Sequence, residues 1–164
     1  LLDPYGNFKW AKALAGAQWS MSEGTSIIAD KFGDFFTSGS FVDSIDIDPD
    51  STVYMLYANT SYDRYFAKYD SAGTLKWAFG LDVESGGGSF QSFYGNTNIN
   101  IDYDGNLYCT GSFSDTVDFD PGYDTLQLSA NAGKDIFIAK YTSNGNFSWA
   151  KQIGGPATDR GYSI

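Results

Sequence analysis

The chain repeats itself with a period of 72 residues, and this repeat limits the possible folds more than any other feature of the sequence. When residues 27–80 are shifted forward by 72 positions, about twenty of the 54 residues are identical without a gap. Self-similarity at a fixed period indicates one supersecondary unit used more than once, each copy burying its apolar face against the next. The identical pairs include Asp30/Asp102, Gly33/Gly105, Gly39/Gly111, Phe41/Phe113, Asp48/Asp120, Lys68/Lys140, Tyr69/Tyr141, Gly73/Gly145 and Trp77/Trp149.

Partial copies flank the two full units. Gly6 and Trp10 match Gly73 and Trp77 at a spacing of 67 residues. At the other end, Ser163-Ile164 takes the place of Ser26-Ile27. The chain therefore consists of two whole units with a piece of a further unit on either side.

Each unit contains four strand signals separated by turn signals. Tight turns at 30–34 and 102–106 follow the first strand, and tight turns at 70–74 and 142–146 precede the fourth. Asp-Gly and Asn-Gly between apolar runs are strong hairpin signals, because both residues tolerate the positive φ that such turns need. The expected strands are 26–30, 35–41, 64–69 and 75–81 in one unit, and 98–102, 107–113, 136–141 and 147–153 in the next.

The expected strands are apolar on both faces. The run Ile136-Phe137-Ile138-Ala139 does not alternate with polar residues as a half-exposed strand would. A small antiparallel sheet that buries both faces needs a similar sheet on each side, and radial stacking of such blades is the β-propeller solution. We therefore expect an all-β chain that forms part of a β-propeller, which fits the repeat better than a sandwich or a β-solenoid. Its expected parts are the outer strand of a preceding blade at 1–14, blades at 26–81 and 98–153, and the start of a following blade at 161–164.

Three motifs of the second unit carry a family resemblance. They are Gly-Asn-Leu-Tyr-x-Thr-Gly-Ser-Phe at 105–113, Val-Asp-Phe-Asp-Pro-Gly at 117–122 and Gly-Asn-Phe-Ser-Trp-Ala-Lys at 145–151. This pattern resembles the SBBP family of bacterial β-propeller repeats, and the first unit matches it more loosely. The resemblance implies an exported bacterial protein, extracellular or at the cell surface, with adhesive or surface-structural duties. It implies little about the ligand.

The number of blades raises a question of completeness. A closed propeller has roughly four to eight blades, whereas this sequence supplies two and parts of two more. Unpaired strand edges and uncovered blade faces are an aggregation liability. We expect that the chain is a piece of a longer protein whose remaining blades are its first partners; the alternative is that several copies assemble into one ring.

Loop lengths predict where a ligand would bind. Antiparallel strand order places all the tight turns on one face of the disc and the long connections on the opposite face, called here the long-loop face. Loops on a rigid scaffold commonly carry binding residues. The long-loop face is expected to hold an aromatic, Gly-rich link, and exposed aromatic residues beside amides can anchor a protein or stack on a sugar ring. The candidate contacts for a protein or glycan are Trp19, Phe90, Gln91, Phe93 and Tyr94; the alternative is that the aromatic residues of the link pack between blades.

Two acidic segments, within the long second-to-third loops at 42–63 and 114–135, are also expected on the long-loop face and are candidate calcium sites. Alternate carboxylates on an extended chain point to one side, and calcium prefers several oxygen ligands. Asp-Pro and Asp-Gly are also ordinary turn chemistry, in which the carboxylate accepts bonds from nearby backbone amides. The turn at 102–106 is similar to half of an EF-hand loop but lacks the later ligands, so we expect a hairpin turn. The candidate metal ligands are Asp46, Asp48, Asp118 and Asp120, and no other cofactor is expected.

Composition excludes several function classes. The net charge is −10, which argues against nucleic acid and anionic membrane surfaces as main partners, because both reward clustered Lys and Arg. No apolar run is long enough to insert in a membrane as a helix. The chain has no His, which removes Ser-His-Asp triads and His-ligated zinc. Its single Cys109 lies in an apolar run and is expected to be a small core residue.

These observations lead to two hypotheses of function. The first is a non-catalytic extracellular propeller segment of a secreted or surface bacterial protein, with a binding or structural and adhesive role. The alternative is the scaffold domain of an exported enzyme that acts on polysaccharide, with its catalytic residues outside this segment. Fold alone does not decide between them.

Overall fold

The protein is an all-β chain, described here from a computed structural model. The structure describes residues 1–16, 21–59, 62–83 and 93–164, and no helix occurs among them. Accordingly, this part of the chain holds no helix of the length and apolarity that a membrane span needs.

The first four-stranded sheet consists of β2 (Ser22–Ala29), β3 (Phe35–Phe41), β6 (Asp63–Tyr69) and β7 (Leu75–Gly80). The second consists of β9 (Phe93–Ile101), β10 (Leu107–Phe113), β13 (Asp135–Tyr141) and β14 (Phe147–Ile153).

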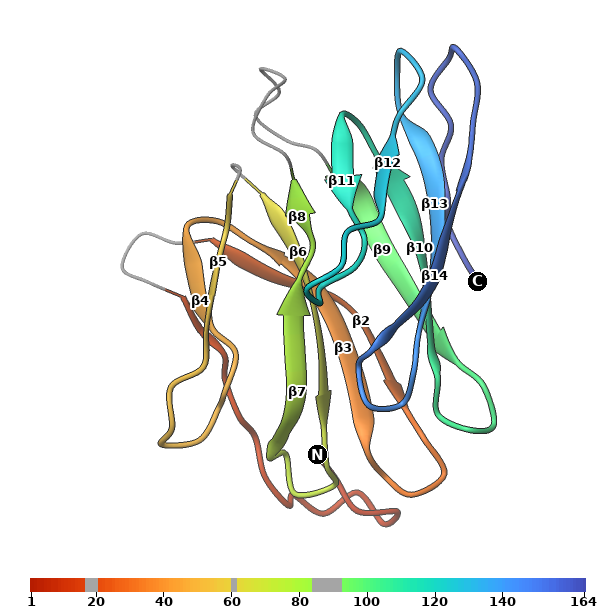
Figure 1. The fold of residues 1–164 in the computed structure, drawn as a ribbon. Helices are drawn as coiled ribbons and strands as arrows, with labels where there is room; N and C mark the ends of the chain where they lie inside the picture. The colour runs from red at the N-terminus through yellow and green to blue at the C-terminus, as the bar shows by residue number, and fades with distance from the viewer. Residues whose placement is uncertain (17–20, 60–61, 84–92) are drawn as a thin grey trace.

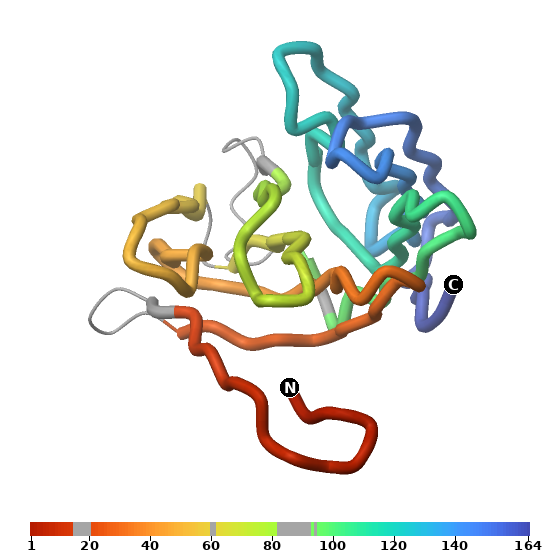
Figure 2. Tube along the Cα trace, turned by 90° about the horizontal axis from the view of Figure 1, so that it is seen from below, coloured from red at the N-terminus to blue at the C-terminus, as the bar shows by residue number. Residues whose placement is uncertain are grey.

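Both sheets are antiparallel meanders, and they stand side by side like blades (Figure 1). The two first strands, β2 and β9, lie next to each other, while β7 and β14 form the outer edges (Figure 2). The hydroxyls of Thr25 and Ser38 in the first sheet each donate a 3.1 Å hydrogen bond to the carbonyl of Thr97 in the second. This radial order is that of β-propeller blades, and the described residues do not close a ring.

The tight turns have the expected hairpin geometry. In the turn after β9, Oδ1 of Asp102 accepts hydrogen bonds from the backbone N–H groups of Asp104 and Asn106, at 3.0 and 2.9 Å. Asp30 and Asp70 make the same pair of bonds in their own turns. Gly105 has a φ of 77°, a conformation that an L side chain rarely adopts. The segment similar to half of an EF-hand loop is therefore a hairpin turn.

Two small three-stranded sheets were not expected from the sequence. The Asp-rich segments, which we expected as loops, fold into short hairpins. One hairpin is β4 (Ser44–Asp46) with β5 (Met55–Tyr57), and the other is β11 (Thr116–Asp118) with β12 (Gln127–Ser129). Each hairpin gains a third strand from the chain that leaves a preceding unit, namely β1 (Ala15–Gly16) on β4 and β8 (Asp82–Val83) on β11.

These hairpins correct the expected position of the acidic segments. Each hairpin runs back along its blade, so its tip lies near the tight turns and away from the long-loop face (Figure 1). Asp120 and Tyr123 line one pocket with Gly145 of the β13–β14 turn. The cause is apolar burial, because Ile45, Ile47, Val117 and Phe119 are all fully buried and pull the hairpins into the core.

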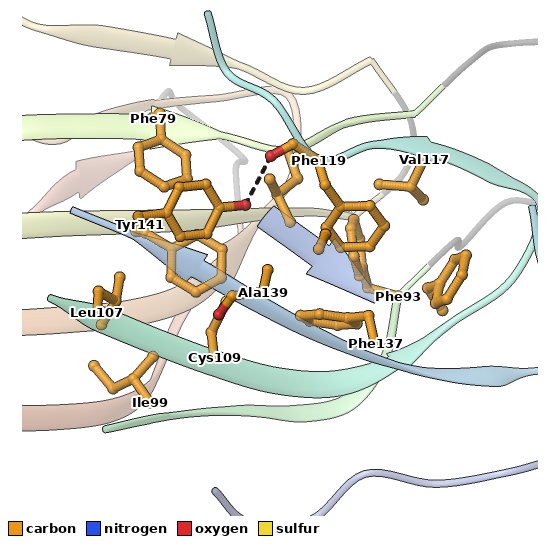
Figure 3. Packing of buried hydrophobic residues seen from close by; sticks show 14 of the residues in the cluster. Phe79, Phe93, Ile99, Leu107, Cys109, Val117, Phe119, Phe137, Ala139 and Tyr141 are labelled. Atoms are coloured by element: carbon orange, nitrogen blue, oxygen red, sulfur yellow. Dashed lines mark hydrogen bonds between the residues drawn. The ribbon is translucent and has the colours of Figure 1, made fainter. Parts of the chain in front are cut away.

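The main core lies between the two blades. Phe79 of the first blade packs on Tyr141 of the second (Figure 3), with ring centroids 4.7 Å apart. The ring of Phe66 lies 6.1 Å from that of Tyr141. Cys109 is fully buried in this cluster, as expected, and burial raises the pKa of its thiol. The first blade is covered on this face, whereas Tyr108, Ile138 and Trp149 on the far face of the second blade are only half-buried.

The flanking segments lie against the blades without joining their sheets. Residues 1–14 form a loose hairpin with one bridge between Leu2 and Phe8. Residues 161–164 run beside β9, where Nδ2 of Asn98 donates to the carbonyl of Tyr162 at 2.6 Å and Nδ2 of Asn100 to that of Ile164 at 3.0 Å. Residues 161–164 therefore lie beside the first strand of the second blade, as β9 lies beside the first strand of the first blade.

Candidate interaction surfaces

The aromatic residues expected on the long-loop face fall into two groups. Trp19, Phe90 and Gln91 lie outside the described residues, and only the backbone of Tyr94 is described. Phe93 is 1% exposed and packs edge-on against Phe137 at 6.0 Å. Phe93 is therefore a core residue between blades and not a surface contact, because it is the first residue of β9 and faces the apolar cluster.

Arg64 occupies the same inter-blade region and was not singled out from the sequence. Its side chain is nearly buried at the start of β6, where Nη2 donates to the carbonyl of Gly95. The guanidinium carbon lies 5.8 Å from the ring centre of Phe93. Burial lowers the pKa of Arg64 to about 10, and the charge of Glu23 opposes that shift. Arg64 thus joins the first blade to the first strand of the second.

The acidic residues of the first hairpin bind backbone amides. Oδ1 of Asp46 accepts hydrogen bonds from the N–H groups of Asp48 and Tyr54, at 3.2 and 3.0 Å. Oδ1 of Asp48 accepts from the N–H of Asp50 at 3.0 Å, and its Oδ2 accepts from the hydroxyl of Thr52. The bond from Thr52 is the main cause that lowers the pKa of Asp48.

The second hairpin repeats this arrangement. Oδ1 of Asp118 accepts from the N–H groups of Asp120 and Leu126, at 3.0 and 2.9 Å, and Oδ1 of Asp120 accepts from Gly122 at 2.8 Å. Within the described residues, no group of three or more acidic or thiol side chains is arranged to hold a metal ion. Calcium binding at these segments stays a prediction, and the observed bonds are those of turn chemistry.

A cleft opens on the opposite side of the disc, between the first tight turns of the two blades. It has a volume of about 560 Å³ and is lined by the turn after β2, the turn after β9, Lys68 and Ser143. Because the two turns belong to successive blades, the cleft is held by the inter-blade packing below it. Binding residues are often found on loops that a rigid scaffold positions in this way.

Two exposed aromatic rings flank this cleft. Phe32 is 77% exposed and Tyr103 is 82% exposed. Nζ of Lys31 lies 3.3 Å from the ring centre of Tyr103, so the side chains of the two turns meet across the gap. A cation over an aromatic face is attracted by the ring quadrupole. The position of Lys31 shows that a cation fits on the Tyr103 ring.

The charges around the cleft are mostly acidic. Nζ of Lys68 lies 3.7 Å from Asp30 and 3.2 Å from Asp34, and the same ammonium lies 4.8 Å from the ring centre of Phe36. Asp102 pairs with Lys140 at 3.4 Å. The side-chain amide of Asn106 is the main cause that lowers the pKa of Asp102 to about 2; the backbone N–H of Asn106 and the ammonium of Lys140 act in the same direction. Asp104 is exposed beside these pairs.

The turns were expected from the sequence, but this cleft was not. Phe32 and Tyr103 do not occupy equivalent positions of the repeat, since Phe32 corresponds to Asp104 and Tyr103 to Lys31. An alignment of the two units therefore does not reveal that Phe32 and Tyr103 form a pair. The available signal was the presence of large aromatic residues in tight turns, where polar residues are usual.

Comparison with known proteins agrees with the architecture. No protein-family model matches the chain. An uncharacterised WD repeat-containing protein of Acanthamoeba polyphaga mimivirus is similar, with 28% identity over 176 aligned residues that cover 98% of this chain. The chain spans only 12% of the length of that viral protein. WD repeats form β-propellers with four-stranded blades, which is the arrangement of the two sheets described above.

Proposed function

We propose that the chain is a non-catalytic part of a β-propeller that binds a protein partner through the cleft between its first tight turns. The observation that carries the proposal is the pair of exposed rings, Phe32 and Tyr103, on either side of one cleft. Exposed aromatic residues at a pocket are typical anchors of protein interfaces. The WD repeat in the viral relative's name supports a propeller of the protein-binding kind.

The partner presents a basic segment with apolar side chains. Four carboxylates line the cleft, namely those of Asp30, Asp34, Asp102 and Asp104, against the ammonium groups of Lys31 and Lys68. The chain as a whole carries a charge of −10. An acidic surface of this kind attracts a cationic partner and steers its approach. A Lys or Arg of the partner pairs with Asp104 while an apolar side chain packs on Phe32.

The proposal is tested with a double variant and a matched control. Wild-type chain, Phe32→Ser/Tyr103→Ser and Tyr57→Ser are immobilised at equal density and exposed to soluble proteins from the source of the gene. Tyr57 is a 70% exposed aromatic residue of the β4–β5 hairpin, so its replacement controls for non-specific binding to exposed aromatic rings. We expect at least one protein to be retained by the wild type and by Tyr57→Ser and reduced about ten-fold or more by the double variant. Equal retention on all three surfaces contradicts the cleft as the contact.

We also propose an exported location for the protein, supported by the similarity of its repeat to bacterial surface propellers. Fractionation of the source cells with an antibody against this chain tests it. Recovery in the medium or at the cell surface supports export, and recovery only in the cell interior contradicts it.

A further inference from the structure

Successive units are joined by a tryptophan that docks on a turn of the next blade. Nε1 of Trp77 donates to the carbonyl of Ser143 at 3.1 Å, and Nε1 of Trp10 donates to the carbonyl of Ser71 at 3.4 Å. In each case the indole covers the glycine two residues further on. A Cβ on Gly145 would lie 2.9 Å from Cδ2 of Trp77, so only glycine leaves room for the ring.

The residue two positions after the tryptophan differs between the two junctions. Phe79 follows Trp77 and packs on the ring of Tyr141 at 4.7 Å. Lys12 follows Trp10, and its ammonium donates to the carboxylate of Asp50 at 2.5 Å and to the carbonyl of Gly73 at 3.0 Å. The blades on which these two residues dock differ at one equivalent position. Asp50 in the first blade corresponds to Gly122 in the second. Lys12 therefore has an acid opposite it, whereas Phe79 shares a cavity with a glycine at the equivalent position.

The outer strand of the second blade repeats the pattern of tryptophan followed by lysine. Trp149-Ala150-Lys151 is identical to Trp10-Ala11-Lys12. Trp149 is half-buried and lies 6.3 Å from the ring of Tyr108. Lys151 is exposed. In the described part of the chain, no carbonyl accepts a bond from Nε1 of Trp149 and no carboxylate pairs with Lys151.

We propose that the face of β14 carrying Trp149 and Lys151 binds a further blade of this repeat, of the type that has an acid at the position of Asp50 and a glycine at that of Gly73. The turn of that blade accepts the Trp149 indole, and its acid pairs with Lys151. A blade of the Gly122 type has no carboxylate at that position, so Lys151 would lack the partner that Lys12 has in the first blade. The residue after Trp-Ala thus selects which blade can follow.

The occupant is a further blade and not a second copy of the chain. In this chain the carbonyl of Ser71 and the carboxylate of Asp50 are already bound by Trp10 and Lys12. A second copy would have to displace residues 1–14 to offer the same surface. This face of the second blade lies away from the Phe32–Tyr103 cleft, so the proposal does not depend on the proposed function.

Extension of the full chain tests the docking of Trp149. Because Ser163-Ile164 already occupies the place of Ser26-Ile27, a copy of residues 28–81 joined after Ile164 continues the repeat with a blade of the Asp50 type. Hydrogen exchange of the indole N–H groups is then followed by NMR, with Trp77 as the internal reference and Trp149→Phe for assignment. We expect exchange at Trp149 to slow by about ten-fold or more in the extended chain. Exchange as fast as in the original chain overturns the proposal.

A double-mutant cycle tests the selection by charge. Lys151→Met, Asp50→Asn in the appended copy alone, and both together are compared in the extended chain by thermal unfolding. We expect each single variant to lower Tm and the double variant to lower it no further than the worse single one. Strictly additive losses overturn the pairing of Lys151 with the acid.

A second extension guards against failure of the appended blade to fold. It carries a copy of residues 100–153, whose equivalent position is Gly122. We expect this blade to protect the Trp149 indole less than the Asp50 type does. Equal protection by both types contradicts the selectivity, and protection by neither contradicts the docking surface.

Discussion

The hydroxyl of Tyr141 donates a 2.9 Å hydrogen bond to the backbone carbonyl of Phe119, which ties the third strand of the second blade to its outer hairpin. Tyr69 repeats the bond in the first blade, to the carbonyl of Ile47 at 2.8 Å. Both tyrosines are almost fully buried, and burial raises the pKa of both hydroxyls. They differ in their surroundings, since Tyr141 lies between the blades whereas Tyr69 lines an open apolar groove of about 500 Å³ beneath Trp10 and Leu14.

Tyr141→Phe is expected to destabilise the protein by about 1–3 kcal/mol, because it leaves the carbonyl of Phe119 buried without a donor. Tyr69→Phe is expected to cost less, because Tyr69 lines that groove and loss of its hydroxyl lets water from the groove approach the carbonyl of Ile47. Urea unfolding of both variants measures the difference. Tyr123→Phe removes a fully exposed hydroxyl and serves as the control, with an expected change within about 0.5 kcal/mol. An equal cost at Tyr69 and Tyr141 would show that the groove is closed to water.

Gly145→Ala is expected to destabilise the protein more than Gly105→Ala. Both glycines have positive φ, 82° and 77°, so the backbone strain is similar and costs about 1 kcal/mol. At Gly145 the new methyl group also meets the Trp77 ring at 2.9 Å, whereas at Gly105 the nearest atom is 3.7 Å away. The excess cost is measured by thermal unfolding of each variant. It should vanish when the pair is repeated in a Trp77→Ala background, and its persistence there would assign it to the backbone alone.

Much of this fold follows from the repeat itself. The expected strands 35–41, 107–113 and 147–153 agree with β3, β10 and β14 to the residue. Identity under a fixed shift aligns two independent copies of the same strand, so turn residues in either copy mark the ends of both. This is why strand bounds were more reliable here than hydrophobic patterning alone allows.

The short hairpins escaped prediction because two signals conflict in their sequence. Ser44-Ile45-Asp46-Ile47 and Thr116-Val117-Asp118-Phe119 alternate polar and apolar residues, which is the pattern of a half-buried strand. The dense acids and the Asp-Pro steps that follow indicate a turn instead. The apolar residues decide the outcome, since all four are buried in the structure. The burial of Asp63 and Asp135 was not predicted either. The two residues are equivalent in the repeat, but their burial at the start of β6 and β13 depends on tertiary packing, which the sequence pattern does not show.

Asp118→Ala is expected to destabilise the protein by about 1–3 kcal/mol, because the N–H groups of Asp120 and Leu126 lose their acceptor. Asp118→Asn keeps Oδ1 and should cost less.

The same pair of variants separates turn chemistry from calcium binding. If the carboxylates serve only the turn, millimolar calcium leaves Tm of the wild type within about 1 °C of its value in chelator, because a ligand raises Tm only when it binds the folded state. A rise of several degrees that Asp118→Asn abolishes would establish a calcium site.

Asp102 is expected to make the stability of the protein depend on pH in the acid range. Its folded-state pKa of about 2 lies below the ordinary value of 3.8. The ionised carboxylate therefore stabilises the fold fully above the ordinary value, and this contribution is lost as the pH falls through the folded-state value. Asp102→Asn retains an acceptor for the turn amides but lacks the charge that pairs with Lys140.

The variant should therefore be less stable than the wild type near neutral pH, and the difference should shrink as the pH falls from about 4 to about 2. Unfolding by urea at several pH values in this range measures the difference directly. Asp104→Asn, at an exposed neighbour in the same turn, is the matched control and should show no such trend. A gap between wild type and Asp102→Asn that stays constant down to the lowest pH would mean that the carboxylate acts only as an acceptor for the turn, with its charge making no contribution.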